Sequence, residues 1–495
     1  MFEAAEVGRK IAKSEFKRRE PELHTRLLDA QRALRETDIP VIVVISGVEG
    51  AGKGALVNRL NEWLDSRGMQ TFAFWDESDE ERERPFFWRF WRTLPERGTI
   101  ALMFGSWYTR PIINRVFGKI DPSAYEKDLT RIAEFERMLT KDKALVFKIW
   151  CHMSKKAQRK RLARESGHAL RDWKLSPLAR RYSKHYDAFA RVSEQAIRAT
   201  DTGECPWHIV EAEDPRYLHL TVGMKLLDAL NHRLTREASV SAAPDERAVT
   251  RRVGTGDETR TVLEQVDLGR RLSDKRYRRQ LAEYQRELNG LVWKARKKGI
   301  DTVALFEGWD AGGKGGAIRR TTAAMDARLF RVISVAAPTD EEKAHHYLWR
   351  FWRHLPRAGH VTIYDRSWYG RVLVERVEGF APESDWMRAY QEINDFEQQL
   401  CEHGAVLLKF WIHIDKDEQL RRFKERERIP WKMHKITDED WRNREKWDAY
   451  EAAVNDMVMR TSTEYAPWTL IPGNDKKFAR VEVLKTFRRG LKAAL

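Results

Sequence analysis

Cysteine and long apolar runs are both scarce in this sequence. The 495 residues contain three cysteines, Cys151, Cys205 and Cys401, far apart and without the spacing of metal ligands. This argues against a disulfide framework or a cysteine-bound zinc site, and it is typical of a reducing compartment. No run of about 18 apolar residues occurs, and the opening MFEAAEVGRKIAKSEF contains no apolar signal region. We therefore expect core thiols, no membrane partner and a cytoplasmic location.

Negative charge is in deficit. There are 91 Lys and Arg against 75 Asp and Glu, a net charge of +16 at pH 7. Such a surface attracts polyanions, so the partner could be a nucleic acid or an acidic substrate. The hydrophobic content of 42% is sufficient for two cores at this length.

A glycine-rich stretch, GWDAGGKGG at 308–316, follows the apolar run at 302–306 and precedes a helical pattern. A strand, a glycine turn and a helix in this order form a phosphate-binding loop, because backbone N–H groups and the helix N-terminus converge on an anion. Gly308 and Gly313 allow the turn, and Lys314 supplies a positive charge between phosphates. The alternative is a glycine turn without a ligand.

The hydroxyl residue that usually follows the lysine of such a loop is missing. Gly315 stands in its place, so its backbone can approach phosphate but it has no side chain to bind magnesium. Another oxygen must then bind the metal. Asp310, inside the loop, is the first candidate.

The same arrangement occurs twice at a constant offset of 261, the difference between 314 and 53. Lys53 ends a similar loop after the apolar run at 41–45. Further landmarks recur at this offset: WRFWR at 88–92 and 349–353, SWY at 106–108 and 367–369, and PW at 206–207 and 467–468. Constant register over whole domains indicates tandem duplication. We predict domains at 1–237 and 261–495, joined by a linker at 238–260.

Short apolar runs alternate with longer helical stretches in both copies, which favours a parallel sheet covered on both faces. The expected strands are 41–46, 71–75, 100–104, 144–150 and 208–211, then 302–306, 331–335, 361–364, 405–412 and 468–471. The fold class is therefore α/β, with two tandem phosphate-loop kinase-like domains, each a five-stranded parallel sheet between helices. The tryptophan-rich helix at 349–352 is expected in the core.

A second carboxylate follows the third strand of the second copy, in YDRSWYGR at 364–371. A carboxylate at the carboxyl end of the strand beside a phosphate loop can hold magnesium, so Asp365 would act with Asp310. Arg366 and Arg371 could bind phosphoryl oxygens through paired donors. The alternative is that Asp365 caps the following helix.

The first copy serves as an internal control. At the fixed offset, Asp365 corresponds to Phe104, Arg366 to Gly105 and Asp310 to Glu49, whereas Lys53 is kept. A phosphoryl-transfer site without its metal carboxylate should be crippled, since this catalysis depends on positioning and charge neutralisation. The second copy is therefore expected to be catalytic and the first to be structural.

Basic residues after the fourth strand form a predicted helical lid between 415 and 441. Arg422 and Arg426 there are expected to bind the transferring phosphate when the lid excludes water, although a solvated helix face is the alternative. Lys476 and Lys477 near the end are expected to contact an incoming polyanion. Their alternative is a solvated pair in a terminal helix.

These motifs together resemble the polyphosphate kinase 2 family, in particular its two-domain class, over nearly the whole chain. The DRSWY motif is the most specific of them. The resemblance implies transfer of a terminal phosphoryl group from inorganic polyphosphate to AMP, giving ADP, with Mg2+ at Asp310 and Asp365 and a possible homo-oligomer. One departure is WKMH at 431–434, where the family more often has the WKLS that the first copy carries at 173–176.

Three other functions remain open from the residues. One is polyphosphate-dependent phosphorylation of ADP to ATP, and another is an ATP-dependent nucleoside monophosphate kinase of the thymidylate kinase type. The third is nucleic-acid binding, suggested by the charge and by 19 tryptophans. It is the least favoured, because the paired aspartates would then be incidental, and it predicts salt-sensitive binding without phosphoryl transfer.

Overall fold

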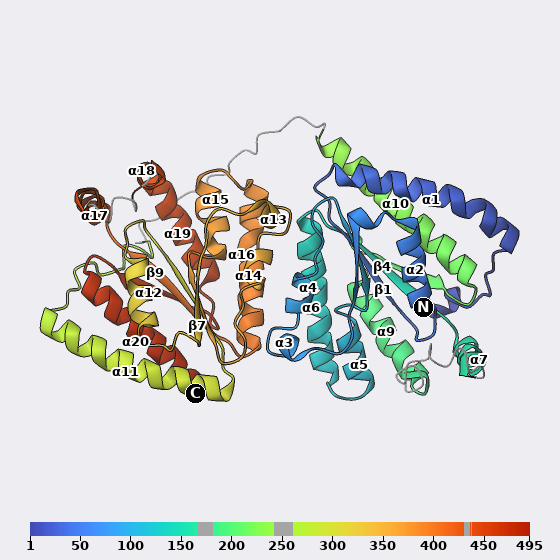
Figure 1. Ribbon diagram of the computed structural model, residues 1–495, viewed down its shortest axis with the longest axis horizontal. Helices are drawn as coiled ribbons and strands as arrows, with labels where there is room; N and C mark the ends of the chain where they lie inside the picture. Colours follow the sequence, from blue (N-terminus) through green and yellow to red (C-terminus); the bar gives the residue numbers. More distant parts are fainter. Residues whose placement is uncertain (167–181, 242–260, 430–435, 437) are drawn as a thin grey trace. The chain divides into compact units, whose positions relative to one another are not determined.

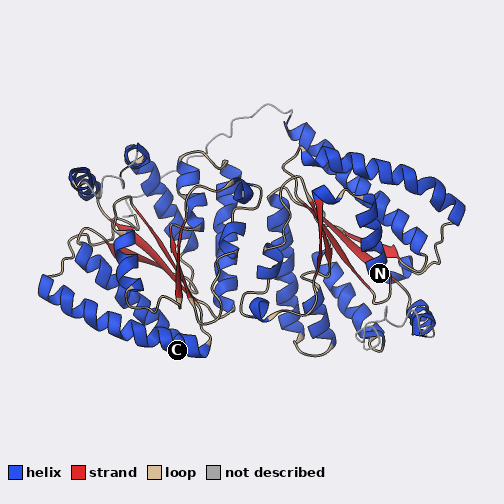
Figure 2. Ribbon diagram, in the orientation of Figure 1, coloured by secondary structure: helices blue, strands red, loops and turns tan. Residues whose placement is uncertain are grey.

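The computed structural model describes residues 1–166, 182–241, 261–429, 436 and 438–495. The chain forms two compact units, each with a five-stranded parallel sheet between layers of helices (Figure 1, Figure 2). This confirms the predicted fold class. The predicted linker at 238–260 lies largely outside the described residues, and helix α10 continues through its first positions to Ser241. No described helix is both long and apolar enough to cross a membrane.

The first half of the chain forms a sheet with the strand order β2-β3-β1-β4-β5. Its strands are β1 (Val41–Gly47), β2 (Met69–Ala73), β3 (Ile100–Phe104), β4 (Leu145–His152) and β5 (Trp207–Glu211). Its helical segments are η1 (Phe2–Ala5), α1 (Lys13–Arg35), α2 (Lys53–Trp63), η2 (Ser66–Gly68), α3 (Asp79–Arg82), α4 (Trp88–Trp91), α5 (Thr109–Val116), α6 (Pro122–Lys141), α7 (Lys155–Ser166), α9 (Tyr186–Thr200) and α10 (Pro215–Ser241).

The second half repeats this topology, with the order β10-β9-β6-β8-β7. Its strands are β6 (Thr302–Gly308), β7 (Phe330–Ser334), β8 (Val361–Asp365), β9 (Val406–His413) and β10 (Trp468–Pro472). Its helical segments are α11 (Asp274–Lys298), α12 (Lys314–Thr322), α13 (Asp340–Lys343), α14 (Trp349–Trp352), η4 (Trp368–Val372), α15 (Val374–Val377), α16 (Glu383–Glu402), α17 (Lys416–Arg428), α18 (Asp438–Glu445), α19 (Trp447–Thr461) and α20 (Lys476–Ala494).

All ten predicted strands are present, with ends that differ from the predicted ones by at most two residues. The central strand β6 is buried from Thr302 to Glu307, because helices cover both faces of a parallel sheet. On one face Leu288 of α11 and Phe487 of α20 join the core cluster with Phe306. The tryptophans of α14 are buried, which confirms their predicted place in the core.

The order of the strands decides where the site forms. Strand β6 lies between β8 and β9, and Phe306 near its carboxyl end pairs with Asp365 at the end of β8. The loop that follows β6 and the residues that follow β8 therefore meet at one edge of the sheet. This is the edge where parallel α/β sheets bind ligands.

Candidate active site

The loop between β6 and α12 has the geometry of a phosphate-binding turn. Gly308 has a φ of 148°, and a Cβ there would lie 2.5 Å from the carbonyl oxygen of Ile412 in β9. Gly313 precedes α12 with a φ of 116°. Glycine suits both positions because a side chain would clash or be strained there. Lys314, the first residue of α12, donates from Nζ to the Gly308 carbonyl at 2.5 Å.

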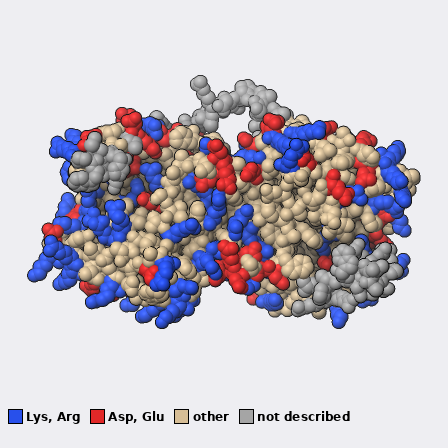
Figure 3. All heavy atoms as spheres, viewed as in Figure 1, with Lys and Arg blue, Asp and Glu red and all other residues tan. Residues whose placement is uncertain are grey.

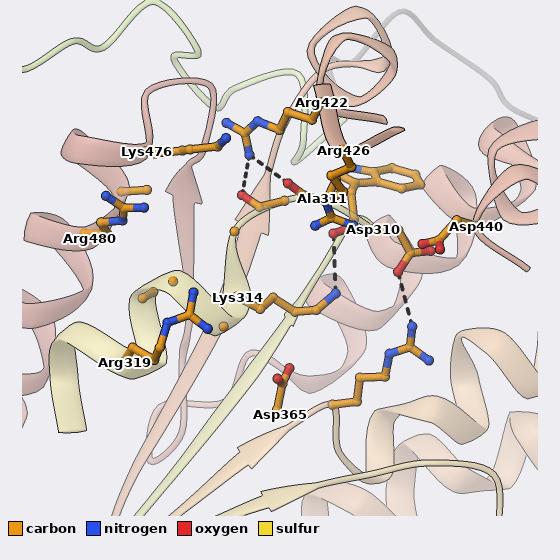
Figure 4. A pocket seen from close by; sticks show the side chains of 18 of the residues that line it. Asp310, Ala311, Lys314, Arg319, Asp365, Arg422, Arg426, Asp440, Lys476 and Arg480 are labelled. Carbon is orange, nitrogen blue, oxygen red and sulfur yellow. Dashed lines mark hydrogen bonds and ion pairs between the residues drawn. The ribbon is translucent and has the colours of Figure 1, made fainter. Parts of the chain in front are cut away.

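A cavity of about 640 Å³ opens at this loop (Figure 4). Its walls come from the loop, the end of β8 and helices α12, α17, α18 and α20. Most of the predicted site residues line it: Asp310, Gly313, Lys314, Gly315, Asp365, Arg366, Arg422, Arg426 and Lys476. The sequence prediction thus selected residues that the fold brings together from four separate segments of the chain.

Asp310 is the carboxylate at the centre of the site. Arg366 donates to its Oδ1 at 3.2 Å, and Asn443 of α18 donates to its Oδ2 at 3.0 Å. Burial raises the pKa of Asp310, but the charges of Lys314 and Arg366 and the two hydrogen bonds outweigh burial, so the pKa lies below its ordinary value. Asp310 is therefore charged at neutral pH.

Arg366 adopts an unusual backbone conformation. Its φ is +64°, whereas the corresponding residue of the first copy is Gly105 with a φ of +78°. An L-residue in this left-handed region costs about 1 kcal/mol relative to glycine. Because the strain coincides with an arginine that contacts Asp310 in the cavity, it indicates selection for function at this position.

Arg422 holds the loop, and this differs from the phosphate contact predicted for it. Its guanidinium donates to the carbonyls of Ala311 and Gly312 at 2.9 and 2.7 Å and to those of Gly473 and Asn474 at 2.6 and 3.2 Å. The side chain is only 2% exposed. Its two terminal NH2 groups are directed at backbone carbonyls, and its Nε donates to Glu418 Oε1 at 2.5 Å, so in this structure it fixes the loop against the connection between β10 and α20.

Arg371 and Lys477 do not line the described part of the cavity. The Nε of Arg371 lies 3.2 Å from Glu375, and its guanidinium lies over the ring of Tyr347. Lys477 forms an ion pair with Asp274 at 2.5 Å. Both side chains are thus paired with acidic or aromatic neighbours, and their phosphate contacts stay predictions. The lid motif at 431–434 and its counterpart at 173–176 lie outside the described residues.

Two arginines of the cavity, Arg319 and Arg480, escaped the sequence analysis. Each lies four residues after a predicted site residue, Gly315 on α12 and Lys476 on α20, and this spacing places it on the same helix face. Arg319, Lys476 and Arg480 lie together on one side of the loop, away from Asp440 (Figure 4). Lys and Arg side chains also crowd the surface over α11 and α20 (Figure 3). The helical spacing was the available signal.

Glu307, the last buried residue of β6, also escaped the sequence analysis. It accepts a hydrogen bond from Ser367 Oγ at 2.7 Å. Burial raises the pKa of Glu307, although the nearby charge of Lys314 opposes this. The first copy has Ser46 at the corresponding position. An acidic residue inside an apolar strand run was the signal for it.

The Trp-Tyr pair that both copies keep has a structural role. Trp368 and Tyr369 donate to Glu397 Oε1 at 3.0 and 2.7 Å, and Lys409 donates to Glu397 Oε2 at 2.7 Å. Glu397 and Lys409 are both fully buried. The first copy repeats the network with Trp107, Tyr108, Glu136 and Lys148. The network ties the segment after β8 to α16 and β9, independently of catalysis.

Glu397→Gln is expected to destabilise the second unit by about 3 kcal/mol, because Lys409 then remains buried without its counter-ion. Urea unfolding followed by tryptophan fluorescence measures this loss. Glu136→Gln is the matched change in the first copy and should act similarly. Combining Glu397→Gln with Lys409→Met should recover much of the stability, and a loss below about 1 kcal/mol for Glu397→Gln alone would contradict the assignment.

In the first copy, the lysine of the glycine-rich loop is bound by residues of the same loop. Lys53 donates to Glu49 at 3.2 Å and to the Gly47 carbonyl at 3.0 Å. Phe104 ends β3 and Gly105 follows it, where the second copy has Asp365 and Arg366. The first copy therefore keeps the turn and the lysine without the carboxylate and arginine beside them.

The fold and the cavity define a phosphate-loop kinase-like domain that occurs twice, with Asp310, Asp365 and Arg366 present in the second copy alone. A model of the family Polyphosphate kinase 2 (PPK2) matches residues 10–238 and 271–495. The chain belongs to this family, which confirms the resemblance inferred from its motifs.

Full-length relatives share both copies. The chain is 48% identical over 495 residues to the polyphosphate:AMP phosphotransferase of Pseudomonas aeruginosa, covering 100% of this chain and 99% of that protein. It is 37% identical over 481 residues to the polyphosphate:AMP phosphotransferase of Acinetobacter johnsonii, covering 96% of each. A crystal structure described as a polyphosphate kinase 2 from Pseudomonas aeruginosa superimposes with a TM-score of 0.89 at 48% identity, covering 100% of this chain and 99% of that one.

Proposed function

We propose that the second copy transfers the terminal phosphoryl group of inorganic polyphosphate to AMP and so forms ADP. The observation that carries this proposal is the division of the cavity. Arg319, Lys476 and Arg480 gather on one side of the phosphate loop, away from Asp440, whereas Asp310 binds Arg366 and Asp365 ends the neighbouring strand β8. The names of the full-length relatives agree with this reaction.

The basic side of the cavity suits polyphosphate as the donor. Arg319, Arg426, Lys476 and Arg480 present cations to a chain that carries about one negative charge per phosphate. Trp309 is the one aromatic residue among the described residues of the cavity wall, and it is stacked on Trp447 at a centroid distance of 3.7 Å. This region therefore favours a phosphate chain over the base of ATP.

Asp310 and Asp365 are proposed to hold Mg2+. Both line the cavity and supply the hard oxygen ligands that this ion prefers, and Gly315 offers no hydroxyl. Within the described residues no group of three or more His, Cys, Asp or Glu could hold a metal. Two carboxylates fit an ion whose other ligands are water and substrate phosphates. When bound, the ion neutralises charge on the phosphoryl oxygens.

The other residues of the site would position the substrates. The loop N–H groups and Lys314 bind the phosphates of the donor, and Lys314 must turn from the Gly308 carbonyl to do so. Arg366 can leave its hydrogen bond to Asp310 and bind the transferring phosphoryl group instead, since its planar donors suit phosphate oxygens. Arg426 faces the same cavity from the lid helix α17.

Phosphoryl transfer by the full chain tests this function, with polyphosphate or ATP as the donor and AMP, ADP or GMP as the acceptor. The expected result is ADP from polyphosphate and AMP, dependent on Mg2+. A preference for ADP as acceptor would keep the site and change the reaction. Activity with ATP alone as donor, or salt-sensitive nucleic-acid binding without transfer, would overturn the proposal.

Arg480→Ala is expected to raise the KM for polyphosphate about tenfold, equivalent to about 1.4 kcal/mol, and to leave the KM for AMP nearly unchanged. The reason is that Arg480 lies with Arg319 and Lys476, away from Asp440, on the side of the cavity that we propose for the donor. Arg488→Ala is the matched control on α20, because Arg488 is paired with Glu287 outside the cavity. An equal rise in both KM values would contradict the assignment of this side to the donor.

A further inference from the structure

Helix α18 begins within the predicted lid, at 438–441, and we name it the lid helix α18. Its Asn443, just beyond the predicted end of the lid, reaches the central carboxylate through its amide. Asn443 Nδ2 donates to Asp310 Oδ2 at 3.0 Å, and Asn443 Oδ1 accepts a hydrogen bond from the Tyr450 hydroxyl at 3.2 Å. The charged Asp310 carboxylate can only accept, so it selects the Nδ2 end of the amide, and the Tyr450 hydroxyl, which can donate, holds the Oδ1 end. Tyr450 itself is placed at the start of α19, where Trp447 stacks on Trp309 of the phosphate loop.

The buried carboxylate of Glu378 binds two cations on either side of Asn443 in the sequence. Glu378 Oε2 accepts from Lys446 at 2.9 Å and lies 3.3 Å from Arg442. Its side chain is 5% exposed, and its Oε1 is buried without a hydrogen-bond partner among the described residues. A buried unsatisfied oxygen costs about 1–3 kcal/mol. Glu378 pairs with cations on both sides of Asn443 in the sequence, Arg442 and Lys446, and so fixes the chain around that amide.

The first copy replaces this polar set with aromatic rings. At the constant offset, Glu378, Asn443, Lys446 and Tyr450 correspond to Phe117, Tyr182, His185 and Phe189. Phe117 contacts the other three rings at centroid distances of 5.8, 5.1 and 6.0 Å. The polar set is thus absent from the copy that also lacks the counterparts of Asp365 and Arg366. The aromatic contacts show that the fold does not require polar residues at these four positions. We therefore associate the polar set with the site of the second copy.

The two hydrogen-bond donors to Asp310 differ in charge, and therefore in whether a metal ion can bind the same carboxylate. Arg366 is a cation and would be repelled by a metal ion on the same carboxylate, whereas the amide of Asn443 is neutral and leaves other lone pairs available. Neutral donors of this kind orient metal-binding carboxylates in many sites. We propose that Asn443, oriented by Tyr450, is a positioning residue that holds Asp310 for the metal ion, so that lid helix α18 is part of the metal site. This inference rests on the proposed function, because it requires a metal at Asp310.

Binding of Mn2+ alone to the full chain, measured by electron paramagnetic resonance, tests the inference without any substrate. Asn443→Ala is expected to weaken Mn2+ binding about tenfold. Tyr450→Phe is expected to weaken it about threefold, since it removes one hydroxyl at a position where the first copy carries phenylalanine. Asn394→Ala is the matched control, because that amide donates to the Arg460 carbonyl at 3.0 Å; it should leave binding unchanged.

The outcomes separate this inference from the proposed function. Asp310→Asn serves as the reference and should abolish the site. If Asp310→Asn lowers the affinity and Asn443→Ala does not, the positioning role is wrong and the proposed metal ligand stands. If Asp310→Asn itself leaves Mn2+ binding unchanged, both are wrong. A defect confined to the KM for AMP, with normal Mn2+ affinity, would make Asn443 a lid residue only.

Discussion

Asp365→Asn is expected to lower kcat for polyphosphate-dependent AMP phosphorylation by about a thousandfold. The substitution keeps the size of the side chain and removes the charge that would hold Mg2+ beside Asp310. Asp365 ends β8 next to the phosphate loop, where no other described carboxylate from that strand can replace it. Steady-state rates at saturating Mg2+ measure the effect, and thermal unfolding should show little change in stability.

Lys53→Ala provides the comparison for Asp365→Asn. Lys53 occupies the place of Lys314 in a loop where Glu49 and backbone carbonyls bind its Nζ. Because the first copy has Phe104 in place of the carboxylate, removing this lysine should change kcat by less than about twofold. A dead Lys53→Ala variant together with an active Asp365→Asn variant would mean that the catalytic and structural roles of the copies are reversed.

Arg366→Gly is expected to lower kcat by roughly a thousandfold or more, the range seen when an arginine at a transferring phosphoryl group is lost. Stability should stay within about 1 kcal/mol of the original, because relief of the strained backbone offsets the lost ion pair with Asp310. Rate measurements and urea unfolding of the same variant separate the two effects. Arg366→Lys should recover only part of the rate, since lysine lacks the planar paired donors.

In the first copy, Gly105 occupies the position of Arg366, and its surroundings do not admit an arginine side chain. A Cβ at Gly105 would lie 2.7 Å from the Phe74 carbonyl oxygen, so Gly105→Arg should destabilise the first unit while leaving transfer at Lys314 nearly intact. A variant Arg366→Gly that keeps activity within tenfold would contradict the role of Arg366, whatever its stability.

Local patterns account for the features that could be predicted from the sequence. Apolar runs of strand length mark the central strands, since burial on both faces requires continuous hydrophobicity, whereas the edge strands β2 and β7 are largely exposed and carry a weaker pattern. Glycines mark the loop at Gly308 and Gly313 because these backbone positions exclude a side chain. The position after the third strand identified Asp365 and Arg366, and the internal repeat, with Phe104 and Gly105 in their places, predicted which copy is catalytic. Each of these patterns can be read from a short stretch of sequence or by comparing positions 261 residues apart.

Only the tertiary structure decided how the remaining residues act. In the sequence, Arg422 is one basic residue of a charged run. The structure shows that α17 places it between two carbonyls of the phosphate loop and two carbonyls of the connection between β10 and α20. Asn443 contacts Asp310 across 133 residues of sequence. Such pairs depend on which helices cover the edge of the sheet, and no periodicity records this. The sequence by itself therefore determined the two-copy fold, the phosphate loop and the copy that retains its carboxylate, whereas the packing of α17, α18 and α20 decided which side chains face the cavity and which ones hold its walls.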